Sequence, residues 1–354
     1  MANPAGKAIL TVLGVFGSMV GFTGFLPNEF PNKEIHMVDR QQQAQDSMVR
    51  VVVGLNGVEG LTEADGPIPA VVAFDENKSY IGASDWSRGF GSIGSGGYAD
   101  IWVSQKKGPG RQATYLQLLG HNDGICIAYI SQVWGDGTPR GWLGDMGQAC
   151  GKRYYYSNIV VGDNDHRPYC TWLNRDAGSD GSDKLEHIEA AAMQIHMEAF
   201  TNFTEDYNTD PGFYCREPAM LFRRKFSYEL YHDDYEFDGL PDPGRIHFWY
   251  AKDADSMPRK KRSLPPRRSS KFDGRLITSV HGRHSARQLC ENDHSYGPDF
   301  VSYAENVFCD MGTREHWPLC DGPVEDECYS MATRSLVTRS GYVKRSHVRV
   351  ESWG

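Results

Sequence analysis

The sequence predicts a mainly β protein, a disulfide-bonded β-sandwich followed by a small Cys-rich C-terminal module. From about residue 80, short apolar runs with β-branched and aromatic residues alternate with turns that contain Gly and Asp. The chain has 38 glycines and 18 prolines, which favour turns, and 42 aromatic residues (18 Tyr, 16 Phe and 8 Trp), which favour strands. Eight cysteines indicate covalent cross-linking.

Length and charge exclude several classes of protein. The 354 residues suffice for one large domain or two ordinary ones. The net charge of −9 argues against a nucleic-acid partner, for which a basic surface is expected. The composition also excludes a coiled coil, a collagen and a polytopic membrane protein.

Residues 1–26 predict entry into the secretory pathway. Lys7 precedes an uncharged apolar run from Ala8 to Leu26, which is typical of a signal peptide. The run also reaches the lower length limit of a membrane span. A cleaved signal peptide, a signal-anchor that holds residues 8–26 in the membrane and a buried core helix are therefore the three interpretations. The first two predict a secreted, extracellular protein and a membrane-anchored surface protein, respectively.

The remaining chain is divided as follows. Residues 27–79 are expected to form an irregular segment, although the runs at 49–55 and 68–74 have the composition of strands. Residues 80–250 are expected to form the β-sandwich, because apolar and polar residues alternate at 99–103 and apolar runs flank the turn at 121–124. Helix propensity predicts a helix over 184–200, with a terminal strand of the sandwich as the alternative.

The even number of cysteines behind a secretory leader predicts disulfides. The cysteines are Cys126, Cys150, Cys170, Cys215, Cys290, Cys309, Cys320 and Cys328. A metal site is less favoured because no C-x2-C pair occurs. The 105 possible pairings leave the connectivity open. Asn77 and Asn202 each begin an N-x-S/T triplet and are candidate glycosylation sites.

Residues 251–275 form a basic linker between the sandwich and the module at 276–354. Nine basic residues stand against three acidic ones among many Pro and Ser residues. Behind a signal peptide, the sequence ending in Lys261-Arg262 predicts a kexin-type cut after Arg262; a solvated charge run is the alternative. Four cysteines lie on each side of the cut, so every disulfide can close within its own half. We expect few contacts across such a linker.

Two groups of motifs carry a resemblance to known proteins. The blocks W-L-G-D-M-G-Q-A-C-G at 142–151, Y-Y-S-N at 155–158 and C-T-W-L-N-R-D at 170–176 resemble a family of uncharacterised fungal secreted proteins. The blocks S-Y-G-P-D-F-V at 295–301 and F-C-D-M at 308–311 resemble the tail that follows the catalytic domain in killer-toxin-like fungal chitinases. The chitinase motif D-G-x-D-x-D-x-E is absent from the sequence. The resemblance therefore implies a secreted fungal protein and assigns no activity.

Two groups of residues are candidates for ligand binding. Aromatic residues near 134–172 form either a sugar-binding platform or part of the core; they are Trp134, Trp142, Tyr155 and Trp172. Acidic loop residues form either a solvated rim or a weak calcium site; they are Asp163, Asp165, Asp176 and Asp180. No other metal or cofactor is expected, and G-x-S-x-G and H-E-x-x-H motifs do not occur.

These observations favour a secreted, non-catalytic protein that binds a cell-wall or cell-surface glycan or a host component, in the manner of an effector or a lectin. The alternative is a secreted hydrolase that acts on a glycan. Its acidic active site is not identifiable from the sequence, because two catalytic carboxylates can lie far apart in the chain.

Overall fold

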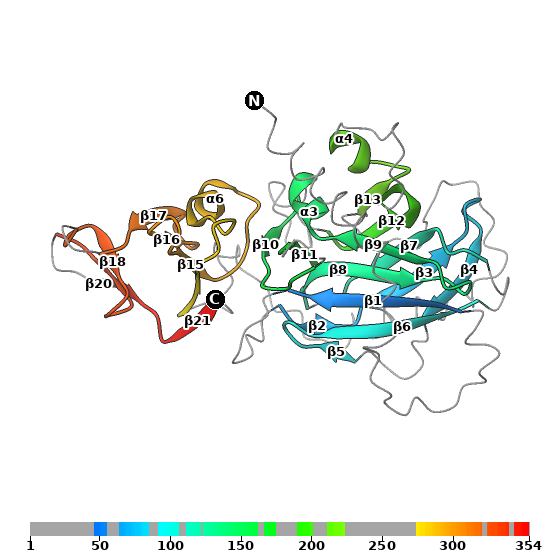
Figure 1. Cartoon of the computed structure of the whole chain (residues 1–354), viewed down its shortest axis with the longest axis horizontal. Helices are drawn as coiled ribbons and strands as arrows, with labels where there is room; N and C mark the ends of the chain where they lie inside the picture. The colour runs from blue at the N-terminus through cyan, green and yellow to red at the C-terminus, as the bar shows by residue number, and fades with distance from the viewer. Residues whose placement is uncertain are drawn as a thin grey trace, which may run out of the picture.

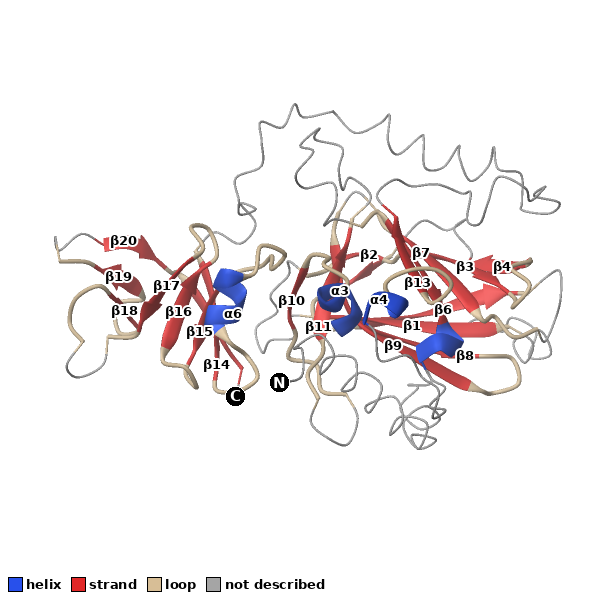
Figure 2. Cartoon of the chain, turned by 90° about the horizontal axis from the view of Figure 1, so that it is seen from above, coloured by secondary structure: helices blue, strands red, loops and turns tan. Residues whose placement is uncertain are grey.

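The computed structural model of the chain is mainly β and has two parts that lie side by side (Figures 1 and 2). It describes residues 46–54, 64–84, 91–105, 111–121, 123–161, 166–174, 190–200, 211–223, 274–320, 324–339 and 343–353. Several predicted features lie outside these residues: the apolar run at 8–26, Asn202, the processing site at Lys261 and Arg262, and the acidic residues Asp163, Asp165, Asp176 and Asp180.

The first part is an eleven-stranded sheet in which every pairing is antiparallel. The strands follow the order β10-β11-β8-β1-β6-β4-β3-β7-β12-β13, and β9 also pairs with β8. Their bounds are β1 Ser47–Val53, β3 Ala70–Phe74, β4 Tyr80–Ser84, β6 Tyr98–Ser104, β7 Tyr115–Leu119, β8 Ile125–Val133, β9 Pro139–Leu143, β10 Tyr154–Tyr156, β11 Tyr169–Leu173, β12 Ala192–His196 and β13 Met220–Arg223. A two-stranded pair, β2 (Gly66–Pro67) and β5 (Ser92–Ile93), accompanies the sheet.

The sheet curls so that its two limbs share one core. Alternate residues of β1, such as Val49 and Val51, are buried in the same cluster as Leu116 and Leu118 of β7. Two short helices, α3 (Asp145–Ala149) and α4 (Pro211–Tyr214), also belong to this part (Figure 1). The predicted mainly β, disulfide-bonded fold class is confirmed.

The predicted irregular segment at 27–79 is wrong over its described portion. β1 lies between β8 and β6, in the middle of the sheet. β3 also belongs to the sheet, between β4 and β7. The apolar residues of both runs fill the core, so the sheet begins at Ser47 and not at residue 80.

The helix predicted over 184–200 is wrong over its described end. Residues 192–196 form β12, which pairs with β7 on one side and β13 on the other. A 3-10 helix, Met197–Phe200, follows. Met193 and Ile195 point into the core, and the burial of these alternate residues outweighs local helix propensity. The alternative, a strand, is correct, although β12 is not terminal.

The second part is the C-terminal module. Its main sheet has the order β17-β16-β15-β14-β21, with β14 parallel to both β15 and β21. The bounds are β14 Arg275–Ser279, β15 Asp299–Ser302, β16 Val307–Asp310, β17 Glu315–Pro318 and β21 Arg349–Trp353. A smaller sheet consists of β18 Cys328–Ser330, β19 Ser335–Val337 and β20 Val343–Ser346. Helix α6 (Ala286–Glu291) starts at Ser285, whose hydroxyl accepts the amide of Gln288.

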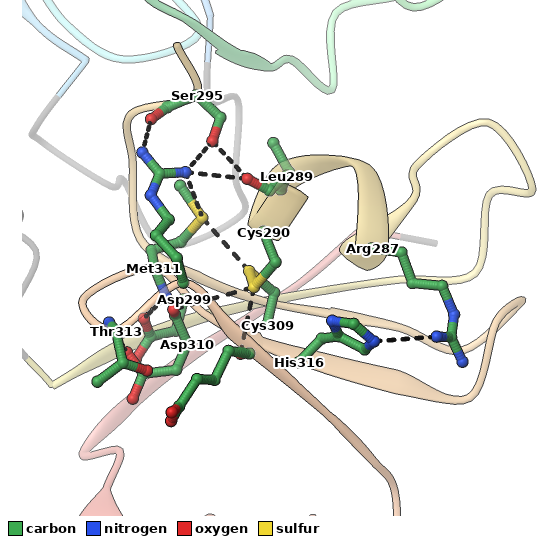
Figure 3. The surroundings of a disulfide bond; sticks show 12 residues. Arg287, Leu289, Cys290, Ser295, Asp299, Cys309, Asp310, Met311, Thr313 and His316 are labelled. Carbon is green, nitrogen blue, oxygen red and sulfur yellow. Dashed lines mark hydrogen bonds between the residues drawn. A yellow bond between two sulfur atoms is a disulfide. The ribbon is translucent and has the colours of Figure 1, made fainter. Parts of the chain in front are cut away.

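The cysteines form four disulfides, and each closes within its own half, as expected. They are Cys126–Cys170, Cys150–Cys215, Cys290–Cys309 and Cys320–Cys328. Figure 3 shows Cys290–Cys309, which ties α6 to β16. Beside it, Asp299 accepts the amide of Met311 at 2.8 Å, and the Ser295 hydroxyl donates to the carbonyl of Leu289 at 2.6 Å.

The expectation of few contacts between the halves is wrong. β10, at one edge of the large sheet, lies against the C-terminal module in both views (Figures 1 and 2). One apolar cluster includes Tyr155 and Tyr156 from the sheet together with Leu289 and Phe300 from the module. The linker composition is therefore a poor guide to contacts between the parts that it joins.

Candidate functional site

The aromatic residues predicted as a sugar-binding platform are part of the core. Trp134, Trp142, Tyr155 and Trp172 are each at most 5% exposed. Their polar atoms have partners inside the protein: the indole N–H of Trp134 donates to the carbonyl of Ala113, and that of Trp142 lies 3.3 Å from the sulfur of Met220. The surface-platform interpretation is wrong, and the core alternative is correct, because these rings find both apolar neighbours and hydrogen-bond partners in the interior.

A different pair of aromatic residues is exposed, on β6. Tyr98 is 45% exposed and Trp102 is 38% exposed. Side chains alternate along this strand, so these two residues and Asp100 share the outer face while Ile101 and Val103 are buried. The two aromatic positions are about 13 Å apart along the strand. The strand therefore presents two rings with a carboxylate between them.

Arg50 of β1 completes this arrangement, because the strand register places it opposite Asp100. Its Nε and Nη2 atoms donate to the two carboxylate oxygens of Asp100 at 2.7 and 2.9 Å. The guanidinium carbon lies 4.2 Å from the centroid of the Tyr98 ring, within the range of a cation–π interaction. Arg50 thus holds both the carboxylate and one aromatic ring in place. We refer to Arg50, Tyr98, Asp100 and Trp102 as the β1–β6 face.

The electrostatics of the β1–β6 face favour a fixed ion pair. Burial alone would lower the pKa of Arg50, but the hydrogen bonds and charge of Asp100 raise this pKa above its ordinary value. Arg50 therefore stays cationic, and its bidentate pairing occupies both oxygens of the carboxylate. In chemical terms, the face offers two flat apolar rings with polar groups between them, which suits binding better than proton transfer.

The remaining predicted sites are distributed as follows. Asn77 is exposed in the turn between β3 and β4, where its backbone N–H donates to the Asp75 carboxylate at 3.0 Å, so its side chain is accessible for glycosylation.

Within the described ranges, no group of three or more His, Cys, Asp or Glu side chains could hold a metal ion. The described part of the chain likewise has no helix with the length and apolarity that crossing a membrane requires.

Part of the β1–β6 face is visible in the sequence. The residues Y-A-D-I-W-V at 98–103 alternate, and the alternation by itself assigns Tyr98, Asp100 and Trp102 to one face of a strand. The partner Arg50 is 50 residues away in sequence and becomes apparent only from the pairing of β1 with β6.

Comparison with known proteins gives no further assignment: no protein-family model matches the chain, and no curated protein matches it.

Proposed function

We propose that the protein is a secreted, non-catalytic binding protein that recognises a cell-wall or cell-surface glycan through the β1–β6 face. The observation that supports this proposal is the exposure of Tyr98 and Trp102 on one side of one strand, with the Arg50–Asp100 ion pair between them. Aromatic rings stack on the apolar faces of sugars, and the partly exposed Asp100 carboxylate, which the buried Arg50 holds in place, can accept hydrogen bonds from sugar hydroxyls. The spacing of the rings suits separate sugar units of one extended chain.

Secretion, a fungal origin, glycosylation at Asn77 and Asn202 and a cut after Arg262 form part of the same proposal. The four disulfides support an oxidising compartment. The apolar run behind Lys7 and the dibasic sequence at Lys261-Arg262 support export and processing. The motifs at 142–158 and 170–176, which resemble those of fungal secreted proteins, are the basis for the proposed origin.

Retention on insoluble polysaccharides tests the binding function. Purified protein is incubated with chitin, β-glucan and mannan, and the bound fraction is measured for the wild type, Tyr98→Ala and Trp102→Ala. We expect the wild type to bind one of the polymers and each substitution to weaken binding roughly tenfold, because each removes one stacking ring.

Tyr303→Ala is the matched control, since Tyr303 is equally exposed (43%) but lies in the C-terminal module. It should bind like the wild type. Equal retention of all four proteins, or no retention of the wild type on any polymer, would contradict the proposed function. Circular dichroism of each variant shows whether the fold is kept.

A further inference from the structure

We propose that the C-terminal module, residues 274–353, is a docked partner of the large sheet that is held by non-covalent contacts alone, so that a chain cut between the two parts remains a two-chain complex. This inference rests on the processing step proposed above and is independent of the carbohydrate site. The first observation is the disulfide pattern, because no disulfide joins the two halves and all eight cysteines are paired within them.

The second observation is a backbone junction at the sheet edge. β10 is an edge strand of the large sheet, paired with β11 on one side, and on its other side Tyr154 forms a parallel bridge with Ser295 of the module. The amide of Tyr154 donates to the carbonyl of His294 at 3.2 Å, and the amide of Tyr296 donates to the carbonyl of Tyr154 at 2.9 Å. A short segment of the module thereby extends the sheet, which is a common way for separate chains to bind.

The third observation is a close fit around Tyr155. Its hydroxyl donates to the carbonyl of Pro298 at 2.8 Å, and its ring lies directly against Gly297. A Cβ atom at Gly297 would come within 2.3 Å of the ring, so only glycine fits at this position. Next to it, the indole N–H of Trp172 donates to the carbonyl of Tyr296 at 2.9 Å. Arg153 lies over the Tyr296 ring at 4.4 Å.

The fourth observation is the burial of Tyr156 between the two parts. Its hydroxyl lies 3.1 Å from the carbonyl of Ser285 and 3.2 Å from the Gln288 side-chain oxygen, and it accepts the Ser285 amide at 2.9 Å. Its ring stacks on His284 at 4.8 Å. Burial raises the pKa of Tyr156 well above its ordinary value, as expected for a hydroxyl that is enclosed on all sides.

These contacts have the composition of a stable protein–protein interface, with buried aromatic residues at the centre and hydrogen bonds to the hydroxyls of Tyr155 and Tyr156 and from the indole of Trp172. The tyrosines of β10 come from one half and their partners, residues 284–300, from the other. The two halves therefore have both the apolar contact and the specific hydrogen bonds that a complex requires.

The experiment is limited cleavage of the full chain. The protein is expressed with kexin, and the products are analysed by non-reducing SDS gel and by native gel filtration at micromolar concentration. We expect two bands on the denaturing gel without reductant, and a single native peak that contains both fragments. Separate native peaks would overturn the proposal, and so would fragments that separate on the denaturing gel only after reduction.

A second variant keeps the test independent of kexin. Here residues 259–262 are replaced by the recognition sequence of a site-specific protease, and the same two measurements are made. Cutting by this protease alone would contradict the natural processing site while still testing the association. A chain that resists both proteases would overturn the proposal, since its two parts could not then become separate chains.

Gly297→Ala probes the interface itself. In the cut protein it should weaken association roughly tenfold to hundredfold, because the added methyl group overlaps the Tyr155 ring. Gly94→Ala is the matched control, since a Cβ at Gly94 meets no atom within 4 Å. Equal association of both variants would overturn the proposed interface. Trp102→Ala should lose carbohydrate binding while its two fragments stay associated after the cut. This result would show that the carbohydrate site and the interface between the fragments are independent.

Discussion

The tyrosines of β10 and the aromatic residues of β6 are similar side chains in opposite settings. Tyr155 and Tyr156 belong to an edge strand, and the C-terminal module covers them. Tyr98 and Trp102 belong to a strand inside the sheet, which pairs with β1 from Tyr98 to Val103 and with β4 at Val103 and Ser104, and their rings are exposed on the sheet face. The edge strand has a free backbone with which a partner can pair, whereas the face offers side chains only. We infer that the first group holds the protein together and that the second is available to a ligand.

The largest expected difference is in stability. Tyr156→Ala should lower the free energy of unfolding by about 3–5 kcal/mol, because it leaves a cavity and removes the hydroxyl partner of Ser285. Trp102→Ala should change it by no more than about 0.5–1 kcal/mol. Denaturant titration followed by circular dichroism measures both. Similar losses for the two variants would contradict the assignment of structural and ligand-binding roles.

The next expected effect is a fall in the free energy of unfolding as the pH is lowered, caused by His284 at the interface between the two parts. Burial, with smaller contributions from the charges of His281 and Arg167, lowers the pKa of His284 to about 3. In the unfolded chain the imidazole takes up a proton near pH 6.5, whereas in the folded protein it stays neutral. Stability is therefore complete above pH 6.5 and should fall by about 2 kcal/mol by pH 5.

His284→Asn is the control for this pH dependence. The asparagine side chain can still reach the Ser279 hydroxyl, which lies 2.8 Å from Nδ1 of His284, but it does not titrate. In urea titrations, the free energy of unfolding of the variant should fall much less between pH 6.5 and pH 5 than that of the wild type. An unchanged slope would show that other groups produce the acid sensitivity.

Two glycine substitutions compare a tightly packed position of the interface, Gly297, with an open position outside it, Gly94. Gly297→Ala in the uncut chain should reduce the free energy of unfolding by about 1–3 kcal/mol through overlap with the Tyr155 ring. Gly94→Ala, which has open space, should stay within about 0.5 kcal/mol of the wild type. Thermal denaturation of both variants measures the two losses of stability. A larger loss in Gly94→Ala than in Gly297→Ala would argue against the close fit at Gly297.

The smallest expected effect concerns single hydroxyl groups. Tyr155→Phe removes the hydrogen bond to the carbonyl of Pro298 and should lower the free energy of unfolding by about 1 kcal/mol. Tyr98→Phe should change neither stability nor retention on the polysaccharide, because the ring itself is kept. A large loss of binding in Tyr98→Phe would mean that the Tyr98 hydroxyl, and not stacking, recognises the ligand.

The local patterns of the sequence predicted much of the fold. Alternating apolar residues predicted the strand at 99–103, and the continuous apolar run after the turn at 121–124 predicted the strand at 125–130. The cysteine count predicted disulfides that close within each half. The helix expected over 184–200 failed because the ladders of β7 and β13 and the burial of Ile195 outweigh the propensity of single residues.

The sites were harder to predict because they depend on contacts between distant residues. Whether Tyr155 is exposed depends on Pro298, which is 143 residues away in sequence. The Y-Y-S-N block at 155–158 and the S-Y-G-P-D-F-V block at 295–301 are about 140 residues apart in the sequence, and the structure brings them together at one interface. In contrast, the outward position of Tyr98 and Trp102 follows from strand alternation alone, because the neighbouring residues that face the other way, Ile101 and Val103, are apolar.

The most direct test of the interface is hydrogen–deuterium exchange of the uncut protein. The amides of Tyr154 and Tyr296 each donate to a carbonyl of the other half. If the module is docked as described, peptides that contain these amides should exchange as slowly as the central strands β1 and β8, because opening them requires separation of the two parts. Exchange of both peptides within seconds, at the rate of exposed loops, would show that the two halves are not held together at β10.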